Sequence, residues 1–449
     1  MKSIGRYTVL SRLGRGGMST VYKVAMPVTE KIVALKLLDP PEILAEIIGM
    51  DELRRYFLAE AVAMANLSHP HIADVWDCDE QDGRPFYIME YFCNNLGTLI
   101  GEPEDETGPS RPLRPEQVFR YGAQILEGIA CLHQAGIVHR DIKPGNVMVT
   151  DHHLAKIADF GLALWRQTPL PSPEQIKIGS LAYAPPEQRA NPDEVDGRAD
   201  LYSLGVTLHR LFFGCLPGGA TLTAAGDDSS PLATLLMPFF DKACAPRPGD
   251  RYATAIDMAE AYTALAGQWR SEKKDFCEIV LPTLDEPVPE PTARLRHQPK
   301  RIAGCHAAAQ FGLGADMQPR RFFVNEFVHK RDGTVTDRAT GLVWQRRPHP
   351  QTLPWPQAGP HIDGLNRQRF AGRGDWRLPT VDELLSLLNS RSDPTALCGE
   401  PVVEVRGKWL WSADRRGKNT AWYVCTDPPF VGWQDDTCRY AVLAVASGG

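Results

Sequence analysis

The stretch that constrains the fold most runs from His139 to Gly161 and reads His-Arg-Asp-Ile-Lys-Pro-Gly-Asn-Val-Met-Val-Thr-Asp-His-His-Leu-Ala-Lys-Ile-Ala-Asp-Phe-Gly. Asp141 and Lys143 stand near its start, Asn146 follows, and a second acid, Asp159, lies near its end. Between Asn146 and Asp159, two short apolar runs flank a turn-prone Thr-Asp-His-His, which predicts a small β-hairpin. The hairpin would bring Asn146 and Asp159 close together at its open end.

These residue types suit phosphoryl transfer. Nucleotide phosphates are strongly anionic, and Asp159 and Asn146 offer the hard oxygen ligands that magnesium prefers. Asp141 can orient an attacking hydroxyl and accept its proton, while Lys143 can reach the transferring phosphoryl group. His-Arg-Asp or Asp-Phe-Gly alone would be weak support, but both in this order, with the lysine and the asparagine between them, make chance negligible. The segment resembles the catalytic segment of protein kinases.

The resemblance predicts further parts upstream, beginning with a glycine-rich loop. Residues 13–21 read Leu-Gly-Arg-Gly-Gly-Met-Ser-Thr-Val, and the small residues would let backbone N–H groups approach phosphates closely. Ser19 replaces the third glycine of the family pattern. A lone glycine-rich turn is more often a plain hairpin, so this run carries weight only beside the other parts. The residues expected to contact ATP here are Leu13, Gly14, Gly16, Gly17 and Val21.

A lysine and a glutamate predict the ion pair that holds the nucleotide phosphates. An apolar Ile-Val-Ala-Leu run ends in Lys36, which matches the buried strand lysine that contacts the α and β phosphates. A surface lysine at a strand end is the alternative interpretation. Glu60 precedes a His-Pro at residues 69–70 and resembles the glutamate of the kinase control helix. We therefore expect Glu60 to pair with Lys36.

The run from Phe86 to Phe92 reads Phe-Tyr-Ile-Met-Glu-Tyr-Phe and predicts a buried strand that enters the adenine-binding hinge. The resemblance makes Met89 the gatekeeper and implies that Glu90 and Phe92 offer backbone groups to adenine. On sequence alone, a plain core strand would explain the run equally well. The further nucleotide-binding residues that the resemblance implies are Ala34 and Met148.

A polar, irregular segment at residues 162–178 is typical of an activation loop. Thr168 and Ser172 are its available phosphate acceptors, and Arg140, beside the catalytic aspartate, could bind such a phosphate through a charge-assisted contact. Ser180 stands where the family carries a hydroxyl that contacts the catalytic aspartate and lysine. An ordinary turn serine is the alternative for Ser180.

Two structural contacts are also implied by the resemblance. Pro185-Pro186-Glu187 resembles the Ala-Pro-Glu motif, with Pro185 in place of alanine, and Glu187 is expected to pair with Arg251. Removing one partner of such a buried pair is costly. Asp200 matches the core-helix aspartate that steadies the backbone of the catalytic loop.

Taken together, residues from about Tyr7 to Ala266 resemble a bacterial eukaryotic-like (Hanks-type) serine/threonine protein kinase. The family implies an α+β, bilobal fold with ATP and Mg²⁺ in the cleft, Mn²⁺ being a possible substitute, and γ-phosphate transfer to protein serine or threonine. The preference for serine and threonine over tyrosine depends on Lys143 and Ser180, by analogy. The alternative is a pseudokinase scaffold. Activity is favoured because the expected catalytic and metal-binding residues are all present, namely Lys36, Glu60, Asp141, Asn146 and Asp159.

Global properties agree with this interpretation. The chain has 449 residues and a net charge of −6, which argues against nucleic-acid or membrane-surface partners, because those partners select basic patches. We therefore expect protein substrates. The N-terminus leads directly into the first predicted strand, and no run of about eighteen apolar residues occurs. We expect no membrane insertion and a cytoplasmic location.

The chain divides into three predicted parts. A kinase domain is followed by a proline-rich stretch of mixed charge that is typical of a semi-rigid linker, and then by a smaller domain. The predicted bounds are 1–270 for the kinase domain, with lobes at about 1–93 and 94–270, 271–317 for the linker and 318–449 for the last domain. Within the linker bounds, the Ala- and Gly-rich residues 302–317 are either an ordered lead-in to the last domain or a continuation of the linker. Within the kinase part, the charged stretch 101–114 is interpreted as a solvated loop, with substrate docking as the less favoured alternative.

The last domain contains Asp-Gly turns between alternating strands, one predicted helix at residues 381–388 and seven of the ten tryptophans. Its runs at residues 332–345, 374–380, 409–412 and 421–424 resemble the Lcl C-terminal domain family, which is related to the C-type-lectin-like fold. The resemblance implies a compact α+β domain and little chemistry. The tryptophans are more often core than a ligand platform. We hypothesise that this domain binds a protein or a small ligand and directs or regulates the kinase.

Overall fold

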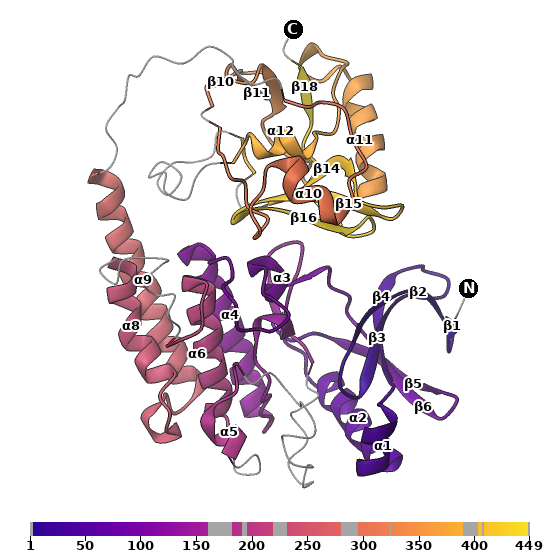
Figure 1. Ribbon diagram of the computed structural model, residues 1–449, viewed down its shortest axis with the longest axis vertical. Coiled ribbons are helices and arrows are strands. Elements are labelled where there is room, and N and C mark those ends of the chain that lie inside the picture. Colours follow the sequence, from indigo (N-terminus) through magenta and orange to yellow (C-terminus); the bar gives the residue numbers. More distant parts are fainter. Residues whose placement is uncertain are drawn as a thin grey trace. The chain divides into compact units, whose positions relative to one another are not determined.

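The computed structural model divides into two units, Met1–Trp269 and Arg270–Gly449, which are drawn in Figure 1. It describes residues 3–159, 182–190, 195–218, 231–279, 295–323, 325–388, 403–405 and 408–447. Each unit has its own sheets. Among the described residues, no helix carries an apolar run long enough to cross a bilayer.

The first unit has an N-terminal lobe of strands and a C-terminal lobe of helices (Figure 1). Its strands are β1 (Ser3–Ile4), β2 (Tyr7–Arg15), β3 (Ser19–Ala25), β4 (Ile32–Leu38), β5 (Val75–Gln81), β6 (Arg84–Met89), β7 (Asn94–Asn95), β8 (Val147–Val149) and β9 (Ala155–Ile157). Its helices are α1 (Glu42–Ile48), α2 (Met50–Ala65), α3 (Leu96–Ile100), α4 (Pro115–Gln134), η1 (Pro144–Asn146), α5 (Pro186–Ala190), α6 (Arg198–Phe213), α8 (Pro231–Ala243), η3 (Pro248–Asp250) and α9 (Ala255–Ile279).

The N-terminal lobe is an antiparallel sheet in the order β1-β2-β3-β4-β6-β5. Strand β4 is buried from Val33 onward, as expected for a central strand with almost no polar residue. Helix α2 buries Leu53, Phe57, Ala61 and Met64, which are spaced three or four residues apart and therefore share one helical face. Leu53, Phe57 and Ala61 belong to an apolar cluster that also includes Tyr87 of β6, so the control helix is packed on the sheet.

The C-terminal lobe is built around α6, which is buried on nearly every side. It packs against α4 and α8 (Figure 1). The predicted catalytic hairpin is present as β8 and β9, paired antiparallel with Val147 opposite Ile157. The backbone N–H of Ala158 donates to the carbonyl of Asn146 at 2.9 Å, which brings the two ends of the hairpin together as expected.

The second unit contains a four-stranded sheet, β10-β11-β12-β18, a three-stranded sheet, β14-β15-β16, and the pair β13-β17. Its strands are β10 (Phe327–His329), β11 (Thr334–Asp337), β12 (Leu342–Gln345), β13 (Leu353–Pro354), β14 (Trp409–Arg415), β15 (Thr420–Thr426), β16 (Pro429–Asp435), β17 (Arg439–Tyr440) and β18 (Val445–Ser447). Its helices are α10 (Gly304–Phe311), α11 (Trp355–Arg367), η4 (Phe370–Gly372) and α12 (Val381–Leu385). Trp344, Trp411 and Trp422 are fully buried, whereas Trp433 is 44% exposed, so most of these tryptophans are core residues.

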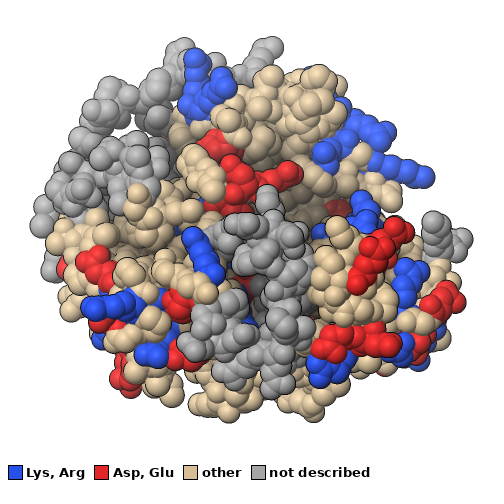
Figure 2. Space-filling view, turned by 60° about the horizontal axis from the view of Figure 1, so that its bottom comes forward, with Lys and Arg blue, Asp and Glu red and all other residues tan. Residues whose placement is uncertain are grey.

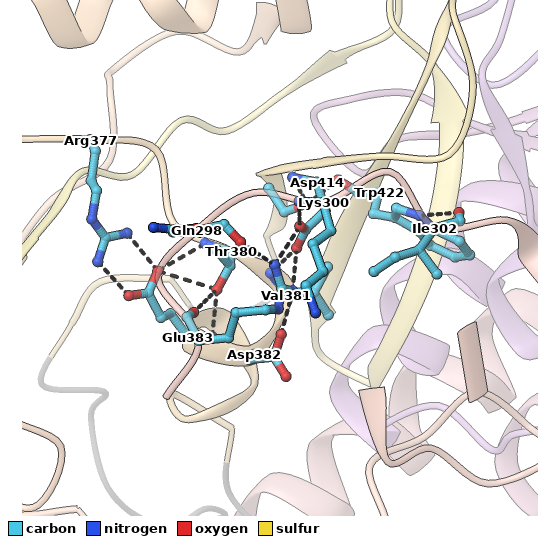
Figure 3. Close-up of polar contacts among 12 residues, drawn as sticks. Gln298, Lys300, Ile302, Arg377, Thr380, Val381, Asp382, Glu383, Asp414 and Trp422 are labelled. Carbon is cyan, nitrogen blue, oxygen red and sulfur yellow. Dashed lines mark hydrogen bonds and ion pairs between the residues drawn. The ribbon is translucent and has the colours of Figure 1, made fainter. Parts of the chain in front are cut away.

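The segment 295–317 belongs to the second unit, and its assignment to the predicted linker 271–317 is wrong. Figure 3 shows its start lying against α12 and β14. Arg296 forms ion pairs with Asp414, at 2.7 Å, and with Asp382. Trp422 Nε1 donates to the carbonyl of Ile302 at 3.1 Å.

Helix α10 then buries Ala307 and Phe311 in the same apolar core as Trp344 and Trp422. Small and apolar residues of this stretch are therefore buried, which its amino-acid composition did not predict. Residues 271–279 are likewise not linker but the end of α9, and residues 280–294 lie outside the described part.

Candidate active site

The predicted Lys36–Glu60 contact is present. Lys36 of β4 donates from Nζ to Glu60 Oε1 of α2 at 2.8 Å, and also to Asp159 Oδ1 at 2.8 Å. Tyr87 of β6 donates its hydroxyl to the same Glu60 oxygen at 3.1 Å. Burial lowers the pKa of Lys36, but the carboxylates of Asp159 and Glu60 outweigh burial and raise this pKa well above its ordinary value. Lys36 therefore carries a permanent positive charge at the junction of strand, helix and hairpin.

The catalytic loop places Asp141 against Asn146. Asn146 Nδ2 donates to Asp141 Oδ2 at 2.8 Å and to the Asp141 carbonyl at 2.9 Å. These bonds fix the amide nitrogen on the Asp141 side and orient the amide oxygen away from it. Lys143 Nζ lies 3.7 Å from Asp141 Oδ2. The sequence thus brings together the acid, the lysine and the asparagine that its spacing predicted.

Asp200 of α6 holds the backbone of this loop. Its carboxylate is fully buried and accepts hydrogen bonds from the backbone N–H groups of His139, at 2.9 Å, and Arg140, at 2.7 Å. His133 Nε2 lies 2.8 Å from the same carboxylate. Arg140 has a left-handed backbone with φ of 67°, which is costly for a residue with a side chain and is stabilised here by the Asp200 contact.

The expected Glu187–Arg251 pair is bidentate. Arg251 donates from Nη1 and Nη2 to the two Glu187 oxygens at 2.6 and 2.8 Å. The Arg251 side chain is fully buried, and its Nε also donates to the Ala245 carbonyl at 2.7 Å. A planar guanidinium satisfies this fork of acceptors in a way that lysine cannot.

The expected nucleotide-binding residues lie on β2, β3, β4, β6 and β8. Gly14 pairs with Val21 across β2 and β3, and Ala34 pairs with Met89 across β4 and β6. The others are Leu13 on β2, Gly16 and Gly17 in the β2–β3 turn, Glu90 and Phe92 after β6, and Met148 on β8. The Glu90 backbone N–H donates to the Asp74 carbonyl at 3.1 Å, so its carbonyl is the group that Glu90 can offer to adenine.

The residues expected to hold magnesium fit an oxygen-liganded ion. Asp159 keeps 51% of its side chain exposed although Lys36 binds one oxygen, and the Asn146 amide oxygen is oriented away from Asp141. Carboxylate and amide oxygens are suitable ligands for a hard cation. Phe160, Gly161 and the predicted activation-loop residues Thr168, Ser172 and Ser180 lie outside the described residues.

The loop 101–114 was expected to be solvated, and this holds for only part of it: Gly101, Glu104, Asp105, Thr107 and Pro109 are exposed. Arg111 and Leu113 are buried, and the loop is held by Arg210, a fully buried residue of α6. Glu106 of this loop accepts a hydrogen bond from Lys143 Nζ at 3.2 Å. The available signal was Arg210 itself, because a charged residue inside an apolar helix requires buried partners.

The distribution of charged side chains on one face of the molecule bears on the kind of partner it can bind. On the face drawn in Figure 2, lysine and arginine side chains are scattered among acidic ones. Binding along a nucleic-acid backbone requires a track of cations. The described residues of this face do not form such a track.

Comparison with known proteins finds a family match for each of the two units. Residues 7–230 match the protein kinase domain family, and residues 333–446 match the Lcl C-terminal domain family. The serine/threonine-protein kinase PknL of Mycobacterium bovis is 33% identical over 323 residues, covering 69% of this chain and 75% of PknL. PknF of Mycobacterium tuberculosis is 32% identical over 273 residues, covering 57% of this chain and 55% of PknF.

A probable serine/threonine-protein kinase of Clostridium perfringens is 35% identical over 222 residues, which is 49% of this chain but only 31% of that protein. Among solved structures, a cysteine-to-alanine mutant of the Mycobacterium tuberculosis PknI kinase domain has 29% identity and a TM-score of 0.44, covering 59% of this chain and 97% of that one. The chain belongs to the serine/threonine protein kinase family. The comparisons give no support to the pseudokinase alternative.

Proposed function

We propose that the chain is an active kinase that transfers the γ-phosphate of ATP, with Mg²⁺, to serine or threonine hydroxyls of proteins. One observation carries this proposal: Lys36 contacts both Glu60 and Asp159 at 2.8 Å. A single cation therefore links the control helix to the metal-binding aspartate, which is the arrangement that phosphoryl transfer requires. Because the reaction consumes ATP, we also propose that the protein acts in the cytoplasm.

Each catalytic residue has a distinct task. Asp141 orients the substrate hydroxyl and accepts its proton as the bond between that oxygen and the γ-phosphorus forms and the bond to the β-phosphate oxygen breaks. Asn146 fixes Asp141 by two hydrogen bonds, and Lys143 places positive charge beside the transferred group. Lys36 holds the α and β phosphates.

Asn146 and Asp159 would hold the metal ion. A bound Mg²⁺ neutralises the charge that develops on the phosphate oxygens. Carboxylate and amide oxygens suit both Mg²⁺ and Mn²⁺, so the choice of Mg²⁺ over Mn²⁺ is part of the proposal.

A transfer assay with γ-labelled ATP tests the proposal. Asp141→Asn should lower the rate of label transfer at least about 100-fold, because it removes the proton acceptor. Asp151→Asn, a matched change in the turn of the same hairpin, should leave the rate unchanged. Equal transfer by Asp141→Asn and the unmodified chain would refute the proposal.

We further propose that the second unit, for which we retain the expected C-type-lectin-like fold, binds a protein or small ligand that regulates the kinase. A pocket of about 700 Å³ in this unit supports the idea, since that is the size of ordinary ligand pockets. The charged or ionisable residues of its lining are Arg296, His297, Lys300, Arg377 and Glu383.

A deletion tests the regulatory role. It should begin at Leu295, because residues 295–317 pack with this unit. The shortened chain should differ from the full chain in autophosphorylation, substrate choice or recovered partners. If all three were unchanged, the regulatory role would be excluded.

A further inference from the structure

One buried arginine holds the loop 101–114 through hydrogen bonds. Arg210 of α6 donates to the backbone carbonyls of Glu106 and, at 2.7 Å, of Gly108, and its Nε donates to Ser110 Oγ at 3.2 Å. The Arg210 side chain is fully buried and lies 3.3 Å from a Glu102 oxygen. A guanidinium with this many acceptors holds the loop in one conformation.

This loop conformation places the Glu106 carboxylate beside Lys143 of the catalytic loop. Glu106 has a left-handed backbone with φ of 57°, an unfavourable conformation for a residue with a side chain. Arg210 binds the carbonyl of this same residue. The Glu106 side chain then accepts a hydrogen bond from Lys143 Nζ at 3.2 Å. A strained residue that is held in place and turned toward a catalytic group indicates a functional constraint.

Helix α6 fixes both partners of this contact. Near its start, Asp200 binds the backbone N–H groups of the catalytic loop that carries Lys143. Ten residues later on α6, Arg210 binds the backbone of the loop that carries Glu106. Because an α-helix rises about 1.5 Å per residue, the two anchors are about 15 Å apart along a rigid rod. Helix α6 therefore anchors both the loop that carries Lys143 and the loop that carries Glu106.

We propose that Glu106 is a positioning residue that sets the place of the Lys143 ammonium group during phosphoryl transfer. The inference rests on the proposed kinase activity. Lys143 lies between two carboxylates, Glu106 at 3.2 Å and Asp141 at 3.7 Å. Without Glu106, Lys143 would move toward Asp141 and occupy the carboxylate that must accept the substrate proton. Glu106 thus keeps the ammonium near the phosphoryl group and Asp141 available as a base.

The test compares Glu106→Gln with Glu104→Gln. Glu104 is an exposed residue of the same loop, so its variant is a matched loss of one negative charge. Because Arg210 binds the Glu106 backbone, the substitution leaves the loop anchor intact, and the midpoint of thermal unfolding should not change. We expect Glu106→Gln to lower kcat about 5- to 20-fold, with KM for ATP and peptide within about twofold, and Glu104→Gln to match the unmodified chain.

A second comparison separates positioning from a structural role. In a Lys143→Met background, Glu106→Gln should lower the remaining kcat by less than about twofold, because the group that Glu106 positions is absent. An equal effect of Glu106→Gln in both backgrounds, a rise in kcat, or equality with Glu104→Gln would overturn the inference. If the unmodified chain transferred no phosphate, the kinase proposal itself would fail, which is a distinct outcome.

Discussion

Two proposed catalytic lysines, Lys36 and Lys143, each pair with a glutamate among the described residues, and the two pairs differ in burial. The Lys36–Glu60 pair has side chains that are 5% and 1% exposed, and its atoms lie 2.8 Å apart. The Lys143–Glu106 pair is 19% and 26% exposed, with 3.2 Å between its atoms. Water screens the second pair more than the first. The first pair can hold the Lys36 ammonium group in a fixed position, while the second can adjust as the phosphoryl group arrives.

The largest expected effect comes from replacing the lysine of the buried Lys36–Glu60 pair. Lys36→Met should lower kcat at least about 100-fold, because no other described group can replace the charge beside Glu60 and Asp159. Lys31→Met, just before the same strand, is the control and should retain normal activity. A residual rate above about one tenth in Lys36→Met would contradict the role given to this pair.

The acid of the buried pair should matter less than its lysine. Glu60→Gln leaves Lys36 in contact with Asp159, so we expect kcat to fall about 10- to 100-fold. Glu52→Gln removes a partly exposed acid, paired with Arg55, from the same helix and provides the control. Steady-state kinetics on both variants measure the difference. A Glu60→Gln enzyme as active as the control would show that the control helix does not act through Lys36.

The salt concentration should affect the two lysine–glutamate pairs to different extents. Raising the salt concentration from about 0.05 to 0.5 M shortens the Debye length to a few ångströms and weakens the partly exposed contact. The ratio of kcat between the unmodified chain and Glu106→Gln should therefore shrink about threefold. The corresponding ratio for Glu60→Gln should stay constant, because that pair is buried. Equal changes in both ratios would contradict the assigned difference in burial.

The smallest expected effect is on the pH profile. Burial lowers the pKa of Lys143, but Asp141 and Glu106 outweigh burial and raise this pKa above its ordinary value. A raised pKa keeps the ammonium charged as pH rises. Removing Glu106 lowers the pKa again, so the alkaline loss of kcat should begin at lower pH in Glu106→Gln than in Glu104→Gln. Superimposable profiles would contradict the contribution of Glu106 to the charge of Lys143.

The parts of the site that the sequence predicted are those encoded by short, fixed spacings. The catalytic hairpin and the Asp200 contact with its loop are present as expected. So are the contacts Lys36–Glu60 and Glu187–Arg251. Lys36, Glu60 and Glu187 lie on regular elements, and Arg251 directly follows η3. Each of these residues belongs to a recognisable motif, so its position follows once the motif is identified.

The parts that were missed lie outside these motifs and include irregular backbone. Arg210 binds Glu106 across 104 positions of sequence, and the loop between them has no periodic pattern that predicts its path. Segment 295–317 resembled linker because its Ala- and Gly-rich composition conceals a few buried anchors, such as Ile302 and Phe311. Helix α11 was missed because Pro360 and two glycines lower its helix propensity, which packing overrides.

The most direct test of the account is phosphoamino-acid analysis after incubation of the full chain with γ-labelled ATP, Mg²⁺ and a protein substrate. The account predicts label on phosphoserine and phosphothreonine, and none above background when Asp141→Asn replaces the unmodified chain. Label of equal strength on the Asp141→Asn chain, or label confined to phosphotyrosine, would contradict it.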